Sequence, residues 1–128
     1  VAETNRGLYH AALANASNHL VALTVQSMDL LSAAGVADPG AMLAPLMTAS
    51  LDNALQRGDE ALTGPVMRGD ARTVAEHLRV LSELSGHTRD SYQAMARLTA
   101  DRAIAAGLLS AQRAEALLDV LTSREERP

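Results

Sequence analysis

The sequence contains no cysteine, no lysine, no phenylalanine and no tryptophan, and its only aromatic residues are two tyrosines. Without cysteine, the chain can form neither a disulfide nor a thiolate ligand or nucleophile. Without lysine, it cannot supply a Schiff-base amine or a lysine general acid. The scarcity of large aromatic side chains means that the core is built from small and aliphatic side chains, which lets helices pack closely.

Patterns typical of strands, membrane spans and secretion are also missing. No segment alternates polar and apolar residues with a period of two, and the apolar runs are too short to cross a bilayer. No signal peptide opens the chain, so we expect a cytoplasmic protein. The net charge of −4 is dispersed and the arginines occur singly, which argues against nucleic acid or a membrane as the partner.

Alanine and leucine dominate, with 25 and 20 of the 128 residues. This composition predicts one all-α domain over residues 1–122, a bundle around one long N-terminal helix, with a frayed tail at 123–128. Capping residues, glycines and prolines predict helices over residues 5–34, 38–57, 70–84, 88–106 and 110–122, with a short turn at 59–62. Pro45 should kink or divide the second of these helices.

Several apolar residues are predicted to face inward. They are Val74, Leu78 and Leu81, and then Tyr92, Met95, Leu98 and Ala103. The long first helix has two apolar sides, formed by Leu13, Ala16, Leu20, Leu23 and Leu31 and by Val21, Val25 and Met28. This is more apolar surface than a short bundle covers, so the pattern favours a homodimer.

The connection between residues 62 and 78 gathers two glycines, a proline and an Arg-Gly-Asp step immediately before a new helix. Such a loop can bind an anion or a carbonyl group, with Thr63 and Gly64 at its start. Spacing alone favours a helix-breaking corner instead. Arg68 could pair with a carboxylate or phosphate, although such an arginine is more often exposed. Asp70 is first of all an N-cap, and His77 fits an exposed helix surface.

Polar residues in the first helix form a second candidate site. Asn18 could hydrogen-bond a substrate oxygen, with His10 as proton donor or orienting group, or both could lie on a solvated face. Asn15 and His19 fit the solvated face, and Asn53 fits either polar surface or a further substrate amide. No histidine spacing indicates a metal site, and neither a nucleophile elbow nor a Gly-x-Gly-x-x-Gly fingerprint occurs.

Three stretches together resemble a known family. They are residues 9–23, residues 51–54 with Asp52-Asn53, and residues 62–78 with Thr63-Gly64-Pro65 and Arg68-Gly69-Asp70. In this order they are similar to the C-terminal helical (DUF2520) domain of Rossmann-type oxidoreductases. More distant similarity connects them to the C-terminal domains of ketopantoate reductases, pyrroline-5-carboxylate reductases, hydroxyacid dehydrogenases and 6-phosphogluconate dehydrogenases.

The resemblance implies a substrate-binding and dimerisation domain of an NAD(P)H-dependent reductase that acts on a small carbonyl compound, such as the 2-oxo acid ketopantoate. The dinucleotide, NAD or NADP, would be bound mainly by an N-terminal Rossmann domain that this chain lacks. His10 and Asn18 would be catalytic, and Asn53, Thr63, Gly64, Arg68 and Asp70 would bind substrate.

One departure from the related enzymes concerns the proton donor. Ketopantoate reductases and hydroxyacid dehydrogenases carry a lysine four residues before the asparagine, where this chain has Ala14 before Asn18. By analogy, His10 is the candidate proton donor. The alternative is a stand-alone helical interaction or dimerisation module without catalysis, in which the connection at 62–70 is only a corner.

Overall fold

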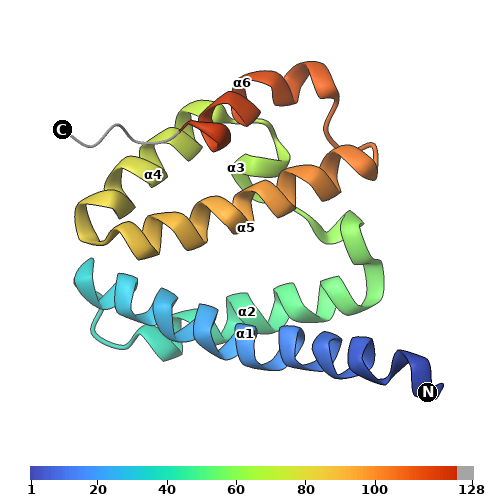
Figure 1. Ribbon diagram of the computed structural model, residues 1–128. Coiled ribbons are helices and arrows are strands. Elements are labelled where there is room, and N and C mark those ends of the chain that lie inside the picture. Colours follow the sequence, from blue (N-terminus) through green and yellow to red (C-terminus); the bar gives the residue numbers. More distant parts are fainter. Residues whose placement is uncertain (124–128) are drawn as a thin grey trace. The chain divides into compact units, whose positions relative to one another are not determined.

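All regular structure in the described part of the chain is helical. The computed structural model describes residues 1–123 and contains no strand there. The helices are η1 (Glu3–Asn5), α1 (Arg6–Ala33), α2 (Pro39–Arg57), η2 (Gly58–Ala61), α3 (Gly64–Met67), α4 (Ala71–Leu84), α5 (Gly86–Ala105) and α6 (Ala111–Thr122) (Figure 1). The predicted all-α class is confirmed. Of the predicted tail at 123–128, residues 124–128 lie outside the described residues.

The chain divides into two compact units, Val1–Thr48 and Ala49–Pro128. The first unit contains α1, which ends where Gly35 adopts a positive φ of 96°. There the amide of Val36 donates to the carbonyl of Leu31, and the amide of Gly35 donates to that of Ser32. This pattern satisfies the last carbonyls of the helix, as glycine C-caps do. No residue of α1 is buried.

Helix α2 begins as predicted, because Asp38 Oδ1 accepts a hydrogen bond from the amide of Ala41 at 3.2 Å. Pro45 does not divide this helix, since α2 is continuous from Pro39 to Arg57, and the alternative of a kink at Pro45 stays a prediction. A proline removes one intrahelical hydrogen bond and crowds one carbonyl, and the remaining bonds of a long helix can maintain it. Helix α2 spans the boundary between the two units.

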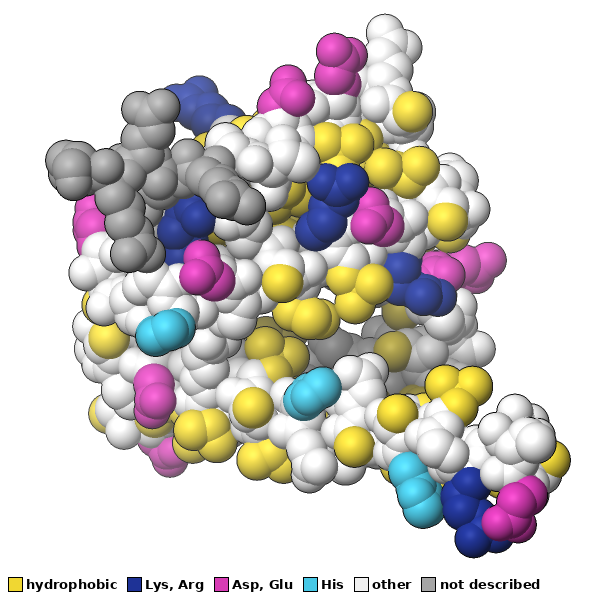
Figure 2. Space-filling model, in the orientation of Figure 1, with side chains coloured by type: hydrophobic (Ala, Val, Ile, Leu, Met, Phe, Trp, Pro, Cys, Tyr) yellow, Lys and Arg dark blue, Asp and Glu magenta, His cyan; other side chains and the backbone are white. Residues whose placement is uncertain are grey.

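The second unit has an aliphatic core with α4 and α5 at its centre, because each of them packs against the other and against α3 and α6. The buried residues are Val66, Val74, Leu78, Ala96, Ala100, Ala103, Leu109, Ala114, Leu117 and Leu121. The inward face predicted for α4 is confirmed at Val74 and Leu78. Hydrophobic side chains also reach the surface at many places on the face drawn in Figure 2.

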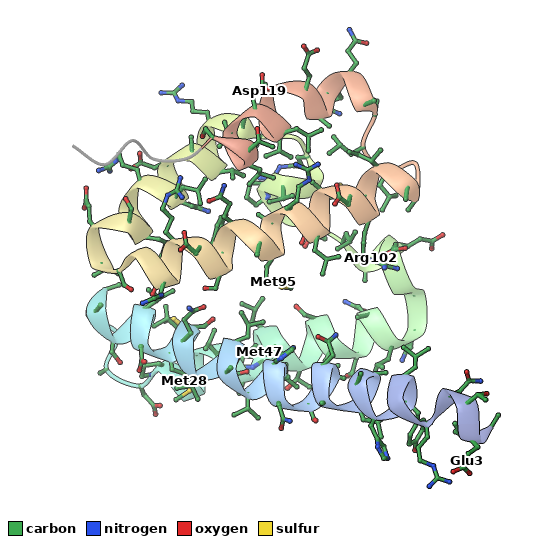
Figure 3. All side chains as sticks on the ribbon, viewed as in Figure 1. Glu3, Met28, Met47, Met95, Arg102 and Asp119 are labelled. Carbon is green, nitrogen blue, oxygen red and sulfur yellow. The ribbon has the colours of Figure 1, made fainter. Side chains whose placement is uncertain are left out.

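The inward face predicted for α5 is partly wrong. Met95 and Leu98 are each 49% exposed, whereas Ala96, Ala100 and Ala103 are buried. Figure 3 shows Met95 on the side of α5 turned away from α6. Alanines on this face of α5 let the neighbouring helices approach closely, so Ala96, Ala100 and Ala103 occupy the core while Met95 and Leu98 lie outside it.

Side-chain caps set the starts of α4, α5 and α6 in the second unit. Asp70 and Ser110 cap α4 and α6 as predicted, each accepting from an amide three residues later. Helix α5 begins at Gly86 and not at Thr88, because Ser85 accepts from the amide of His87 at 3.2 Å. Ser85 ends α4 and starts α5, so the corner between them is tight. No helix among residues 1–123 is long and apolar enough to span a membrane.

Candidate functional site

The connection between η2 and α4 contains a helical turn where the sequence predicts a loop. Thr63 is extended, and α3 begins at Gly64, whose φ of +90° favours glycine. The amides of Gly69 and Asp70 donate to the carbonyls of Val66 and Pro65, at 3.0 and 2.8 Å. These hydrogen bonds close the turn at Asp70, and α4 begins at the next residue.

Gly69 allows this connection to approach α6 closely, because it has no Cβ. Its φ is +70°, and a Cβ at this position would lie 3.0 Å from the carbonyl oxygen of Arg113 and 3.1 Å from Leu109 Cδ1. The guanidinium of Arg113 in turn donates to the carbonyl of Arg68 at 3.2 Å. The Arg-Gly-Asp step therefore has a packing role at its glycine, independent of any ligand.

Asp70 is engaged by the helix that it caps. Its Oδ1 accepts from the amide of Thr73 at 3.1 Å, and its Oδ2 accepts from the Thr73 hydroxyl at 2.8 Å. The hydrogen bonds from Thr73 lower the pKa of the Asp70 carboxyl, and Arg68 and Arg72 add to the effect. The predicted N-cap is confirmed, while a contact between Asp70 and substrate stays a prediction.

A groove of about 370 Å³ opens beside this connection, between α3, α4 and α5. It is lined by Thr63, Pro65, Val66, His77, Tyr92, Met95, Ala96 and Thr99. Most of the lining is apolar, and the exceptions are two hydroxyl groups, one phenol and one imidazole. A concave, mainly apolar surface with a few polar groups is the usual form of a small-molecule site.

His77 and Tyr92 are joined across the groove wall. Nδ1 of His77 lies 2.8 Å from the Tyr92 hydroxyl, within hydrogen-bond distance. The two rings meet edge to face, with centroids 5.7 Å apart and planes at 86°. Burial raises the pKa of Tyr92, so its hydroxyl stays protonated at neutral pH and can donate to the imidazole.

Thr63 is the predicted site residue that the structure brings to this pair. It precedes α3 at the N-cap position but forms no side-chain capping hydrogen bond there. Its hydroxyl is therefore available to a molecule in the groove. Thr99 lines the same groove, although its hydroxyl donates to the carbonyl of Met95 at 2.8 Å.

The other predicted binding residues lie outside the groove lining. Gly64 follows Thr63 and supplies the turn, and Arg68 is exposed at the end of α3. Asn53 is exposed on α2. Within residues 1–123, no cluster of three or more histidine, aspartate or glutamate side chains could hold a metal ion.

The predicted catalytic residues belong to the first unit. His10 and Asn18 are exposed on α1, eight residues and about 12 Å apart along the helix axis. A ligand that touches both must span that distance. Nearby, His19 Nδ1 lies 2.8 Å from Asn15 Oδ1 and both side chains are exposed, which confirms their assignment to a solvated face.

The pairing of His77 with Tyr92 was missed by the sequence reasoning, which placed His77 on an exposed surface and Tyr92 in the core. The positions of the two residues along the sequence nevertheless indicate this pairing. Ser85 is the corner of an antiparallel helix pair, and the two residues lie eight and seven positions from it. Residues equidistant from such a corner face each other across the pair.

Comparison with known proteins identifies a family without an assigned activity. Residues 1–99, which are 99 of the 128 in the chain, match the model of the family described as "Domain of unknown function (DUF2520)". No curated protein matches the chain, and no solved structure matches it. The match covers the groove-lining residues from Thr63 to Thr99.

Proposed function

The chain belongs to the DUF2520 family, and from this premise we propose that it is the substrate-binding and dimerisation part of a cytoplasmic NAD(P)H-dependent reductase. The substrate class is a small carbonyl compound, with 2-oxo acids such as ketopantoate as candidates. The resemblance of residues 9–23, 51–54 and 62–78 to reductase C-terminal domains supports this proposal, and the groove supplies a place for the substrate.

The observation that carries the proposal is the groove between α3, α4 and α5. Its volume of about 370 Å³ is at the small end of the range for ligand sites, about 300–1,000 Å³. The apolar lining suits an alkyl chain. The Thr63 hydroxyl and the His77–Tyr92 pair supply hydrogen bonds for one oxygen function.

The residues of this chain do not fit a dinucleotide. Residues 1–123 contain no strand, and the sequence contains no Gly-x-Gly-x-x-Gly turn to cradle a pyrophosphate. We therefore assign NAD or NADP to a Rossmann-type domain outside this sequence. The residues described here bind and orient the substrate.

A second candidate function is a stand-alone helical interaction module. It is favoured by the absence of any buried residue from α1, where Leu8, Leu13 and Val21 are 73%, 52% and 62% exposed. Exposed apolar side chains along a helix are typical of surfaces that bind another protein. In that reading the groove would have no ligand.

The intact mass of the natural protein, followed by an activity assay, tests the proposal. A mass of about 30 kDa would fit an additional domain of ordinary size. Purified natural protein should then oxidise NADPH or NADH in the presence of a 2-oxo acid. A natural mass near 13.4 kDa, or a larger protein that oxidises neither dinucleotide with any 2-oxo acid, would favour the interaction module.

A further inference from the structure

We propose that His77 holds the oxygen of a small aliphatic ketone through Nε2, and that Tyr92 is the positioning residue that fixes the imidazole for this contact. The inference rests on the proposed function and deepens it, because it names the atoms that recognise the substrate. It also assigns recognition of the oxygen to α4 and α5, whereas the resemblance points to His10 and Asn18 on α1.

The two ring nitrogens of His77 have different surroundings. Nδ1 of His77 is engaged by the Tyr92 hydroxyl at 2.8 Å, so Nε2 is the nitrogen left for a ligand. We place His77 in the tautomer in which the Tyr92 phenol donates to Nδ1 and the imidazole carries its proton on Nε2. A hydrogen-bond donor is what a carbonyl oxygen requires.

His77 and Tyr92 differ in burial. Tyr92 is half-buried and contacts the core, whereas His77 is exposed at the groove. The edge-to-face contact between their rings restrains the imidazole further. A donor held by a fixed side chain loses less entropy on binding than a free one does.

The remaining lining of the groove is mainly apolar. Pro65, Val66, Met95 and Ala96 present an apolar surface, and no arginine lines the groove. The groove therefore recognises the alkyl part and the carbonyl oxygen of a ligand, and a charged group such as the carboxylate of a 2-oxo acid must lie outside this lining. Methyl isobutyl ketone has both features and is small enough for the groove, so it is the probe we choose.

Two substitutions at the same position separate ligand binding from structural support. In His77→Asn the short amide can reach Tyr92 in place of Nδ1 but cannot replace Nε2. In His77→Gln the longer amide can replace Nε2 and loses the bond to Tyr92. A purely structural His77 would make Asn the better replacement, and a ligand-binding His77 would make Gln the better one.

Titration of the 128-residue chain with methyl isobutyl ketone, followed by the ring nitrogen signals in NMR spectra, provides the measurement. The ketone should move the Nε2 signal of His77 and leave that of His87 in place. His77→Asn should weaken binding about fivefold to tenfold, as loss of one neutral hydrogen bond does, while His77→Gln stays within about twofold. Tyr92→Phe should weaken binding less than His77→Asn does.

His87→Asn and Tyr9→Phe are the matched controls, since neither residue lines the groove. Both should bind the ketone as the unaltered chain does. An unmoved His77 signal, or equal affinity of His77→Asn and the unaltered chain, would overturn the inference. Failure of the natural protein to oxidise NADPH or NADH would instead overturn the proposed reductase and leave a ketone site at His77 intact.

Discussion

At the scale of single residues, contacts between near neighbours in the sequence can be predicted, whereas contacts with residues far along the chain cannot. The caps Asp38, Asp70 and Ser110 are predictable because each binds an amide only three residues away. The roles of Gly69 and His77 depend on partners more than ten residues away. Arg113 and Tyr92 are brought to them by the packing of helices, which local spacing does not encode.

Gly69→Ala should destabilise the chain through two effects at once. An alanine at φ +70° costs about 1–2 kcal/mol, and the contact of its Cβ with the Arg113 carbonyl adds about 1–3 kcal/mol of overpacking. Gly107→Ala is the matched control, because Gly107 has a φ of +75° with nothing within 4 Å of the added Cβ. Urea unfolding of both variants measures the difference, and equal losses would contradict the packing role of Gly69.

At the scale of helices, boundaries are largely predictable and buried faces only partly so. Helix α4 has its apolar residues on one side, so Val74 and Leu78 are correctly assigned to the core. Helix α5 carries large apolar residues on one side and alanines on another. Hydrophobicity alone predicts that Met95 and Leu98 are buried, but the face of α5 that packs against the neighbouring helices carries the alanines.

Ala100→Leu should therefore be far more harmful than the same change on the outer face of α5. Ala100 is fully buried, and three added carbon atoms have no space there, so we expect a loss of about 1–3 kcal/mol or a failure to fold. Ala94 is exposed on the same helix, so Ala94→Leu should change the free energy of unfolding by less than about 0.5 kcal/mol. Thermal unfolding followed by circular dichroism compares them, and similar midpoints would show that α5 buries a different face.

At the scale of the whole molecule, the all-α class follows from composition, but the candidate site does not. The resemblance points to α1 and to residues 62–70, and only Thr63 of the predicted residues lines the groove. His10, Asn18, Asn53 and Arg68 are exposed, Gly64 is partly buried in the turn, and Asp70 is engaged in capping. The predicted arrangement of the bundle around α1 stays a prediction, as does the catalytic role of His10 and Asn18.

The unburied surface of α1 bears on the assembly of the molecule. Leu13 and Leu20 are seven residues apart, so they lie on nearly the same side of the helix, and they are 52% and 40% exposed. If this side forms the dimer interface, Leu13→Glu and Leu20→Glu should each shift the chain toward monomer at high micromolar concentration, because an unpaired charge would be buried between the copies.

Sedimentation of the unaltered chain and of the two variants measures this shift. Val80→Glu is the control, because Val80 is 42% exposed but lies on α4 in the second unit. Glutamate is a good helix former, so circular dichroism should show unchanged helix content in all three variants. A monomeric unaltered chain would contradict dimerisation itself, whereas a dimer that survives both leucine substitutions would place the interface away from this side of α1.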